Sequence, residues 1–139
     1  MGAEAWIFLS IGDAEREGPA TLDRIIGAAD ANNHAIPNVG EFEQAVGQLL
    51  GAGLITAAPE RYSLTLQGQE LYRMINSEER GHITRFVDTA KEWRDRAPSE
   101  AAAVRWSVDP THFDQAYQQY SRCAQKAIRN LTKRHKRGR

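Results

Sequence analysis

Side chains that could perform catalysis or hold a metal ion are few and widely scattered. The four histidines, at positions 34, 82, 112 and 135, show neither the His-x-His nor the His-Glu-x-x-His spacing of a metal site. Glu79 and His82 form one Glu-x-x-His unit, but a di-metal centre in a helical bundle needs two such units, and the sequence has no second one. Asp109 and His112 have a related spacing that helix capping explains. The sequence also has no glycine-rich phosphate loop, so we expect no enzymatic activity, no cofactor and no metal site.

Cysteine content and hydropathy predict where the chain resides. Cys123 is the only cysteine, which excludes an internal disulfide framework and favours a reducing compartment. No apolar run approaches the ~20 residues that a membrane span requires. The first apolar stretch is preceded by Glu4 and by no Lys or Arg, whereas a secretory signal begins with basic residues. We therefore expect a cytoplasmic protein that makes no use of a membrane.

The formal net charge of zero conceals two oppositely charged parts of the 139-residue chain. Residues 1–121 hold 10 Lys and Arg against all 18 acids, net −8, whereas residues 122–139 hold 8 Lys and Arg and no acid, net +8. Cations near a helix C-terminus suit the helix dipole, but eight without one acid exceed what capping requires. Such an extension indicates contact with nucleic acid or with an acidic surface. The acidic part of the chain is one such surface, so self-association or a folded-back tail stays open.

Local signals in residues 3–75 predict three helices, a hairpin and a fourth helix. Residues 3–14 form an apolar helix, and Thr21 can cap the second helix. Asn38 can cap the third helix, with Glu41 closing a capping box, and Gly53 fits a left-handed C-cap. Residues 54–56 and 62–65 are strand candidates at hairpin spacing, and Thr65 can cap the fourth helix.

This order of elements resembles the winged helix-turn-helix domains of bacterial regulators of the MarR and PadR type. The resemblance covers about residues 3–75. It implies the fold first and DNA binding as a tendency of those families, with the third helix in the major groove and the wing on the DNA backbone or minor groove. The residues that carry it are Leu50-Gly51-Ala52-Gly53-Leu54-Ile55 at the end of the third helix, then Tyr62-Ser63-Leu64-Thr65, Gly68 and Leu71 after the wing.

The third helix has a side suited to base recognition but no charge suited to phosphate. Its buried stripe is expected to centre on Phe42, Val46 and Leu49. The opposite side then carries Gly40, Gln44, Gly47, Gln48 and Gly51. Gln44 and Gln48 are chemically able to read adenine. Positions 1–75, however, hold 4 basic and 10 acidic residues, and phosphate neutralisation supplies most non-specific affinity for DNA.

Two further features of this domain admit more than one interpretation. Gly47 and Gly51 would create a smooth strip, which either lets a partner helix or nucleic-acid backbone approach closely or is tolerated on a solvated face. Arg61 in the wing is either a phosphate contact or an ordinary solvated residue.

The second half predicts two long helices. Residues 76–98 form an amphipathic helix with apolar side chains at helical spacing over 83–93, and Asp109-Pro110 starts a final helix. That helix packs on residues 83–93 of the same chain, or pairs with a second chain, or does both. It carries a heptad-like seam of Phe113, Tyr117, Tyr120, Ala124, Ala127 and Leu131.

We thus expect a mainly α fold with a small β-hairpin: a winged helix over 1–75, an amphipathic helix over 76–98, and a C-terminal helix with a basic tail over 99–139. The leading hypothesis is a DNA-binding, regulator-like protein, possibly dimeric through its C-terminal helices. The alternative is a protein-interaction module with no specific DNA binding, for which the candidate interface residues are Gly47, Gly51, Phe113, Tyr117 and Tyr120. The candidate nucleic-acid contacts are Gln44, Gln48, Arg61, Arg129, Lys133, Arg134, Lys136 and Arg137.

Overall fold

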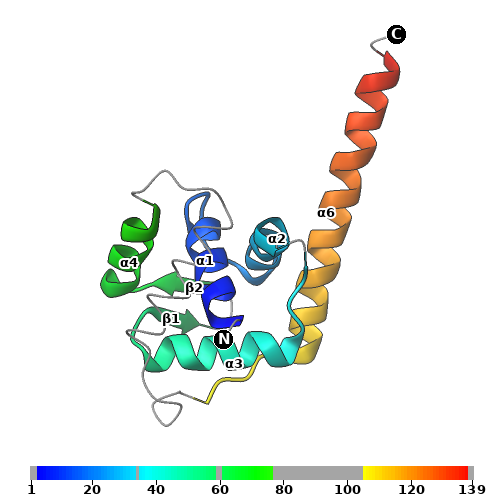
Figure 1. Ribbon diagram of the computed structural model, residues 1–139. Coiled ribbons are helices and arrows are strands. Elements are labelled where there is room, and N and C mark those ends of the chain that lie inside the picture. Colours follow the sequence, from blue (N-terminus) through cyan, green and yellow to red (C-terminus); the bar gives the residue numbers. More distant parts are fainter. Residues whose placement is uncertain (1–2, 34, 59–60, 77–104, 138–139) are drawn as a thin grey trace.

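The computed structural model describes residues 3–33, 35–58, 61–76 and 105–137, with only the backbone at 134–137. The fold is mainly helical with one small antiparallel hairpin, as expected (Figure 1). The amphipathic helix expected within residues 76–98 lies, beyond residue 76, outside the described residues. The elements are α1 (Ala3–Glu15), α2 (Leu22–Asn33), α3 (Val39–Gly51), β1 (Ile55–Ala58), β2 (Arg61–Leu64), α4 (Leu66–Asn76) and α6 (Pro110–Arg137).

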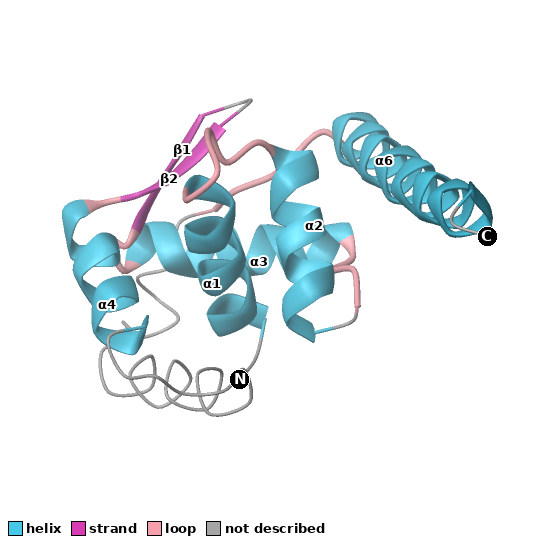
Figure 2. Cartoon of the chain, turned by 90° about the horizontal axis from the view of Figure 1, so that it is seen from above, coloured by secondary structure: helices cyan, strands magenta, loops and turns pink. Residues whose placement is uncertain are grey.

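Helix α1 is the centre of the core because it is apolar on nearly every side. Nine of its residues are buried, and it packs against α2, α3, α4 and β2. Figure 2 shows α1 with α4 on one side and α2 on the other. The indole Nε1 of Trp6 donates a hydrogen bond to the carbonyl of Ala29 at 2.9 Å, so the one polar atom of this buried side chain is satisfied.

The two predicted boundaries of α3 are confirmed by their caps. The side chain of Asn38 accepts the N–H of Glu41 at 2.8 Å, and the Glu41 carboxylate accepts the N–H of Asn38, which completes the capping box. Gly53 has a φ of +71°, and the N–H of Leu54 reaches back to the carbonyl of Leu49 at 3.1 Å. This closes α3 with the expected left-handed glycine.

The hairpin joins the core through one of its faces. Strands β1 and β2 pair in register from Ile55 opposite Leu64 to Ala58 opposite Arg61. Ile55, Tyr62 and Leu64 are buried, and the N–H of Tyr62 donates to the carbonyl of Ala20 at 3.0 Å. The hairpin is thereby tied to the segment that precedes α2.

Residues 105–109 return the chain to the core before α6 begins. The Trp106 ring lies edge-on to Tyr62 at 6.2 Å between centroids, and the N–H of buried Val108 donates to the Glu43 carboxylate at 3.0 Å. The Asp109 carboxylate accepts the N–H of Thr111 at 2.9 Å, so the predicted start of the last helix is confirmed. From there α6 runs past α2 and projects away from the other elements (Figure 1).

Candidate nucleic-acid interface

The outward side of α3 is less accessible than the helical pattern predicted. Gln44 is exposed, as expected, but Gln48 is half-buried. The side-chain oxygen of Gln48 is enclosed and accepts no hydrogen bond within the described part of the chain. Gly47, expected on an open surface, is buried, and Gly51 is half-buried. The prediction of an exposed glycine strip was therefore wrong.

A segment about 60 residues away in the sequence lies against α3. The apolar pattern of α3 predicted one buried side, and that side packs on α1. The segment that precedes α6 covers a second side, where Val108 is buried and bonded to Glu43. Gly47 is one turn beyond Glu43 on that same side of the helix.

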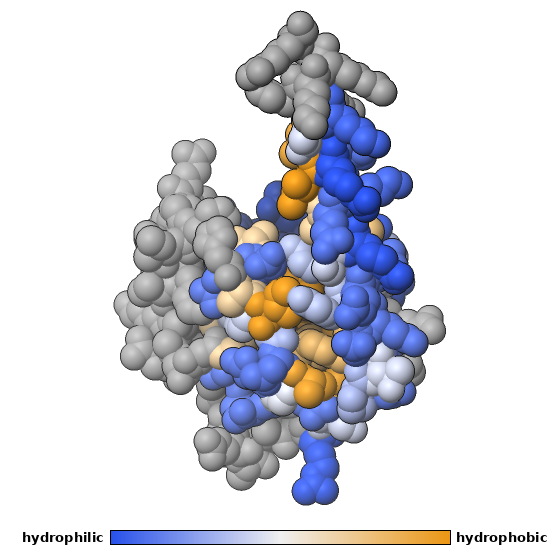
Figure 3. All heavy atoms as spheres, turned by 90° about the vertical axis from the view of Figure 1, so that its right-hand side faces the viewer, coloured by the Kyte–Doolittle hydropathy of each residue, from blue (hydrophilic) through white to orange (hydrophobic). Residues whose placement is uncertain are grey.

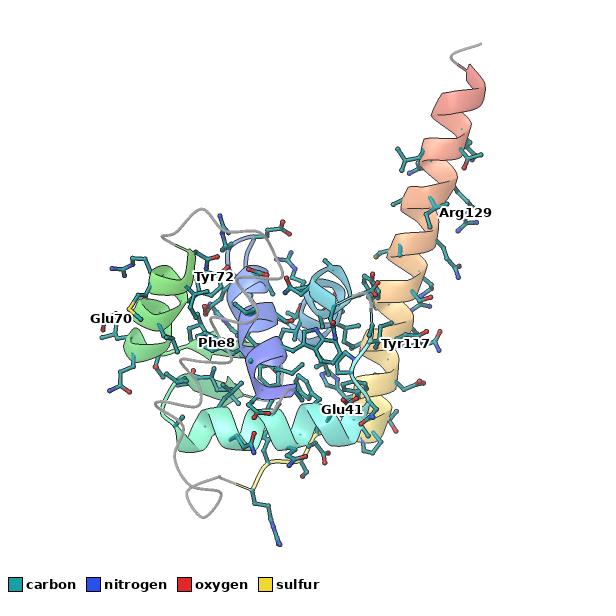
Figure 4. The ribbon with its side chains drawn as sticks, viewed as in Figure 1. Phe8, Glu41, Glu70, Tyr72, Tyr117 and Arg129 are labelled. Atoms are coloured by element: carbon teal, nitrogen blue, oxygen red, sulfur yellow. The ribbon has the colours of Figure 1, made fainter. Side chains whose placement is uncertain are left out.

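Among the described residues, few cations lie near α3: Arg61 in the hairpin and Arg105 in the segment that precedes α6. The helix itself contains no Lys or Arg. Arg61 is exposed at the start of β2, directly after residues 59–60, which lie outside the described residues. Glu41 is exposed at the N-terminal end of α3, the end nearest α6 (Figure 4). The α3 surface therefore offers an amide, Gln44, but little attraction for phosphate.

Helix α6 carries a row of cations on a single side. Arg122, Lys126, Arg129 and Lys133 are all exposed. Their 4-3-4 spacing keeps them on one face, at successive rises of about 6, 4.5 and 6 Å. Figure 4 shows Arg129 on the projecting part of α6, well away from α1. Three further candidate nucleic-acid contacts, Arg134, Lys136 and Arg137, lie in the last turn of α6, where the structure describes only the backbone.

The first three turns of α6 are anchored to α2 and α3. Phe113 is buried with its ring 5.6 Å from that of Phe42, and the hydroxyl of Tyr120 donates to the Asp30 carboxylate at 2.6 Å. This hydrogen bond to Asp30, with burial and the carboxylate charge adding to it, raises the pKa of Tyr120 to about 12. Gly27 permits the close approach, since a Cβ there would lie 3.1 Å from the Tyr120 ring.

Two of the three aromatic residues proposed for an interface therefore have partners within the chain. Phe113 and Tyr120 pack on α3 and α2, whereas Tyr117 is 37% exposed beside them. Asp30, which holds Tyr120, was not singled out from the sequence, and no local pattern links two residues 90 positions apart.

Beyond Tyr120 the apolar stripe of α6 continues into solvent. Ala124 is half-buried, Ala127 is exposed, and Ile128 and Leu131 are 63% and 65% exposed. On a helical wheel these four residues lie about 180° from the row of cations. Figure 3 shows the same division, with hydrophobic residues on one flank of the projecting helix and hydrophilic residues on the other.

A groove with acidic walls lies where α6 leaves the other helices. It has a volume of about 540 Å³ and is lined by α1, α2 and the α6 residues Tyr120 and Cys123. Asp13, Glu17 and Asp23 line it with one cation, Arg24. Of these carboxylates, Asp13 accepts hydrogen bonds from Asn32 and Tyr72, and Asp23 accepts one from the hydroxyl of Thr21 at 2.6 Å.

A second groove, of about 560 Å³, lies between α1 and α4. Arg16 and Arg73 line it, as does Glu15, whose carboxylate accepts the N–H of Leu64 at 3.2 Å. Among the residues that the structure describes, no group of three His, Cys, Asp or Glu side chains is placed to hold a metal ion. The described helices include none that is long and apolar enough to cross a membrane.

Comparison with known proteins leaves the chain without a family assignment. No protein-family model matches it, and neither the curated proteins nor the solved structures yield a match.

Proposed function

We propose that the chain is a small cytoplasmic winged-helix protein, without enzymatic activity, that binds duplex DNA chiefly through the cationic face of α6. The observation that carries the proposal is the row of four exposed cations from Arg122 to Lys133, on a helix that projects clear of the acidic part of the chain. Cations at this spacing can neutralise successive phosphates, and that neutralisation supplies most non-specific affinity for DNA.

The charge distribution explains why α6 has this role and α3 does not. Lys and Arg are absent from α3, and Glu43 on it is already bonded to Val108. A polyanion is repelled by such a surface unless cations elsewhere hold it in place. Along α6 the four cations face solvent with no acid on the same helix after Asp114.

Base recognition in this proposal falls mainly to Gln44. Its side chain is exposed on α3 and chemically suited to the N6 and N7 positions of adenine. Gln48 contributes less because its carbonyl oxygen is enclosed. Arg61, which is exposed at the start of β2, would contact a phosphate from the hairpin. Sequence preference is therefore expected to be weak relative to overall affinity.

A second candidate function, a protein-interaction module, is favoured by the exposed apolar stripe at Ile128 and Leu131. DNA binding does not use these side chains, because they lie opposite the cations. DNA binding would use the cations of α6 and a protein partner would use its apolar stripe, so one experiment distinguishes the two functions.

Fluorescence anisotropy with random and genomic duplex DNA, across a salt series, tests the proposal. The full chain is compared with a truncation after Ser121, which removes every cation of the row, and with Gln44→Ala. We expect binding at low salt that is lost on truncation, and a smaller loss of sequence preference in Gln44→Ala. Absence of binding by the full chain at low salt contradicts the proposal and favours the interaction module.

A further inference from the structure

We propose that the groove between α1 and α4 binds a small phosphate monoester that carries hydroxyl groups, with its phosphate held by Arg16 and Arg73. The groove has a volume of about 560 Å³, and small-molecule sites have volumes of roughly 300–1,000 Å³. A groove of this size suits a small molecule and not a duplex. The site is therefore separate from the proposed DNA contacts, and the inference does not depend on DNA binding.

The inner wall of the groove is an aromatic ring that lies directly on α1. A Cβ at Gly12 would collide with the ring of Tyr72, so glycine permits this close approach. The hydroxyl of Tyr72 donates to the Asp13 carboxylate, and the ring lies edge-on to Phe8 at 6.5 Å between centroids. Figure 4 shows Tyr72 between α4 and α1. A hydrogen bond and packing thus hold this wall in place, so the groove is preformed.

The two arginines of the groove have no anionic partner within the described part of the chain. Arg16 and Arg73 are exposed, and neither forms an ion pair or a hydrogen bond with another described residue. Asp13, three positions before Arg16, already accepts a hydrogen bond from Tyr72. Glu70, three positions before Arg73, lies on the side of α4 that faces away from α1 (Figure 4). Two unpaired guanidinium groups that line one groove indicate a site for an anion.

The carboxylate that lines the groove does not cancel this positive charge. Both oxygens of Glu15 face the N–H of Leu64, at 3.2 and 3.4 Å, so this carboxylate is engaged at the end of β2. The described lining contains two Arg and one Glu and so carries net +1, whereas residues 1–121 as a whole carry net −8. The groove is therefore a local positive region in an acidic part of the chain, and it attracts anions.

The number of guanidinium groups favours a phosphate over a carboxylate. A phosphate monoester carries about −1.5 to −2 charges at pH 7 and has three acceptor oxygens. It can therefore bind two arginine side chains at once, whereas one guanidinium already matches both oxygens of a carboxylate. Arg16 extends from α1 and Arg73 from α4, so a phosphate between them would be held from both walls of the groove.

Two amides on α4 indicate the chemistry of the rest of the ligand. Gln69, Tyr72, Arg73 and Asn76 line the groove at the i, i+3, i+4, i+7 spacing of a single helix face. The Nε2 of Gln69 donates to the Leu64 carbonyl at 3.4 Å, and the Nδ2 of Asn76 donates to the Tyr72 carbonyl at 2.8 Å. Within the described part of the chain their side-chain oxygens have no donor, so they can accept hydrogen bonds from hydroxyl groups.

Isothermal titration calorimetry of the full chain with ribose 5-phosphate, inorganic phosphate and ribose tests the assignment. We expect ribose 5-phosphate to bind more tightly than inorganic phosphate, and ribose alone not to bind. Arg16→Gln with Arg73→Gln should raise the Kd for ribose 5-phosphate by at least about tenfold, because charge-assisted hydrogen bonds are lost. Arg24→Gln with Arg105→Gln removes the same charge outside the groove and should leave the Kd unchanged. All four side chains are exposed, so both variants retain the fold.

Two more variants test the place and the chemistry of binding. Gln69→Ala should weaken ribose 5-phosphate and leave inorganic phosphate unchanged, and an equal affinity for the two compounds in the wild type overturns the assignment of an ester. The combined variant Lys126→Gln, Arg129→Gln and Lys133→Gln should bind ribose 5-phosphate like the wild type, even where it loses DNA. Failure of both phosphate compounds to bind, or equal losses in the two arginine pairs, overturns the proposal. Loss of binding in the α6 variant also overturns it, because the phosphate would then lie on α6.

Discussion

Phe113 and Leu131 lie on the same stripe of α6, yet their truncation should have very different consequences for stability. Phe113 is 8% exposed and its ring contacts Phe42, whereas Leu131 is 65% exposed. Truncation of a buried Phe to Ala typically costs 3–5 kcal/mol, and we expect about 3 kcal/mol at Phe113 because it lies at the edge of the core. Leu131→Ala should change the free energy of unfolding by less than about 0.5 kcal/mol.

Urea denaturation followed by tryptophan fluorescence measures both values. High salt and dilute protein keep the chain monomeric, so that any role of Leu131 between chains does not contribute. A loss below about 1 kcal/mol for Phe113→Ala would refute the docking of α6 on α3. Equal losses for the two variants would refute the division of α6 into a packed part and a projecting part.

Three further results are expected. Gly68→Ala should lower Tm strongly in a calorimetric scan, because its Cβ would lie 2.1 Å from the Leu54 carbonyl oxygen and the backbone must shift; an unchanged Tm contradicts this close approach. Asn38→Ala should cost about 1 kcal/mol in chemical denaturation through loss of the α3 cap, and a neutral result would show the cap to be dispensable. The hydrogen bond of Tyr120 contributes fully to the free energy of unfolding below pH 10, and this contribution is lost as pH rises towards the folded-state pKa of about 12. Tyr120→Phe should therefore reduce the decline in stability between pH 10 and 12. Identical pH profiles for the wild type and the variant would exclude the contact with Asp30 as the cause of that decline.

The elements that the sequence predicted well are those specified by neighbouring residues. Asn38 with Glu41 and Gly53 with Leu54 determine the two ends of α3 through contacts within a few positions. The same holds for the start of α6 at Asp109. Such caps are local chemistry, and no tertiary information is needed to place them.

The surface of α3 could not be predicted in the same way. Gly47 is buried and Gln48 half-buried, although the pattern within α3 places both on the outward side. The hydrogen bond from Val108 to Glu43 spans 65 positions, and no pattern within α3 indicates such a contact. The heptad-like seam raised a similar difficulty, since its spacing is uniform while its environment changes after Tyr120. Periodicity indicates which residues of α6 share a face, but the position of α2 determines where along α6 that face becomes exposed to solvent.

The most direct test of the proposed function is the salt dependence of DNA affinity for a variant that lacks part of the cation row. Lys126→Gln, Arg129→Gln and Lys133→Gln are combined in one variant. The control variant replaces Arg16, Arg24 and Arg73, which are exposed on α1, α2 and α4, with Gln. Anisotropy should show the slope of log K against log salt falling by about 0.9 for each residue of the row that is removed, with little change in the control. Equal slopes in the wild type and the α6 variant would contradict the assignment of phosphate binding to α6.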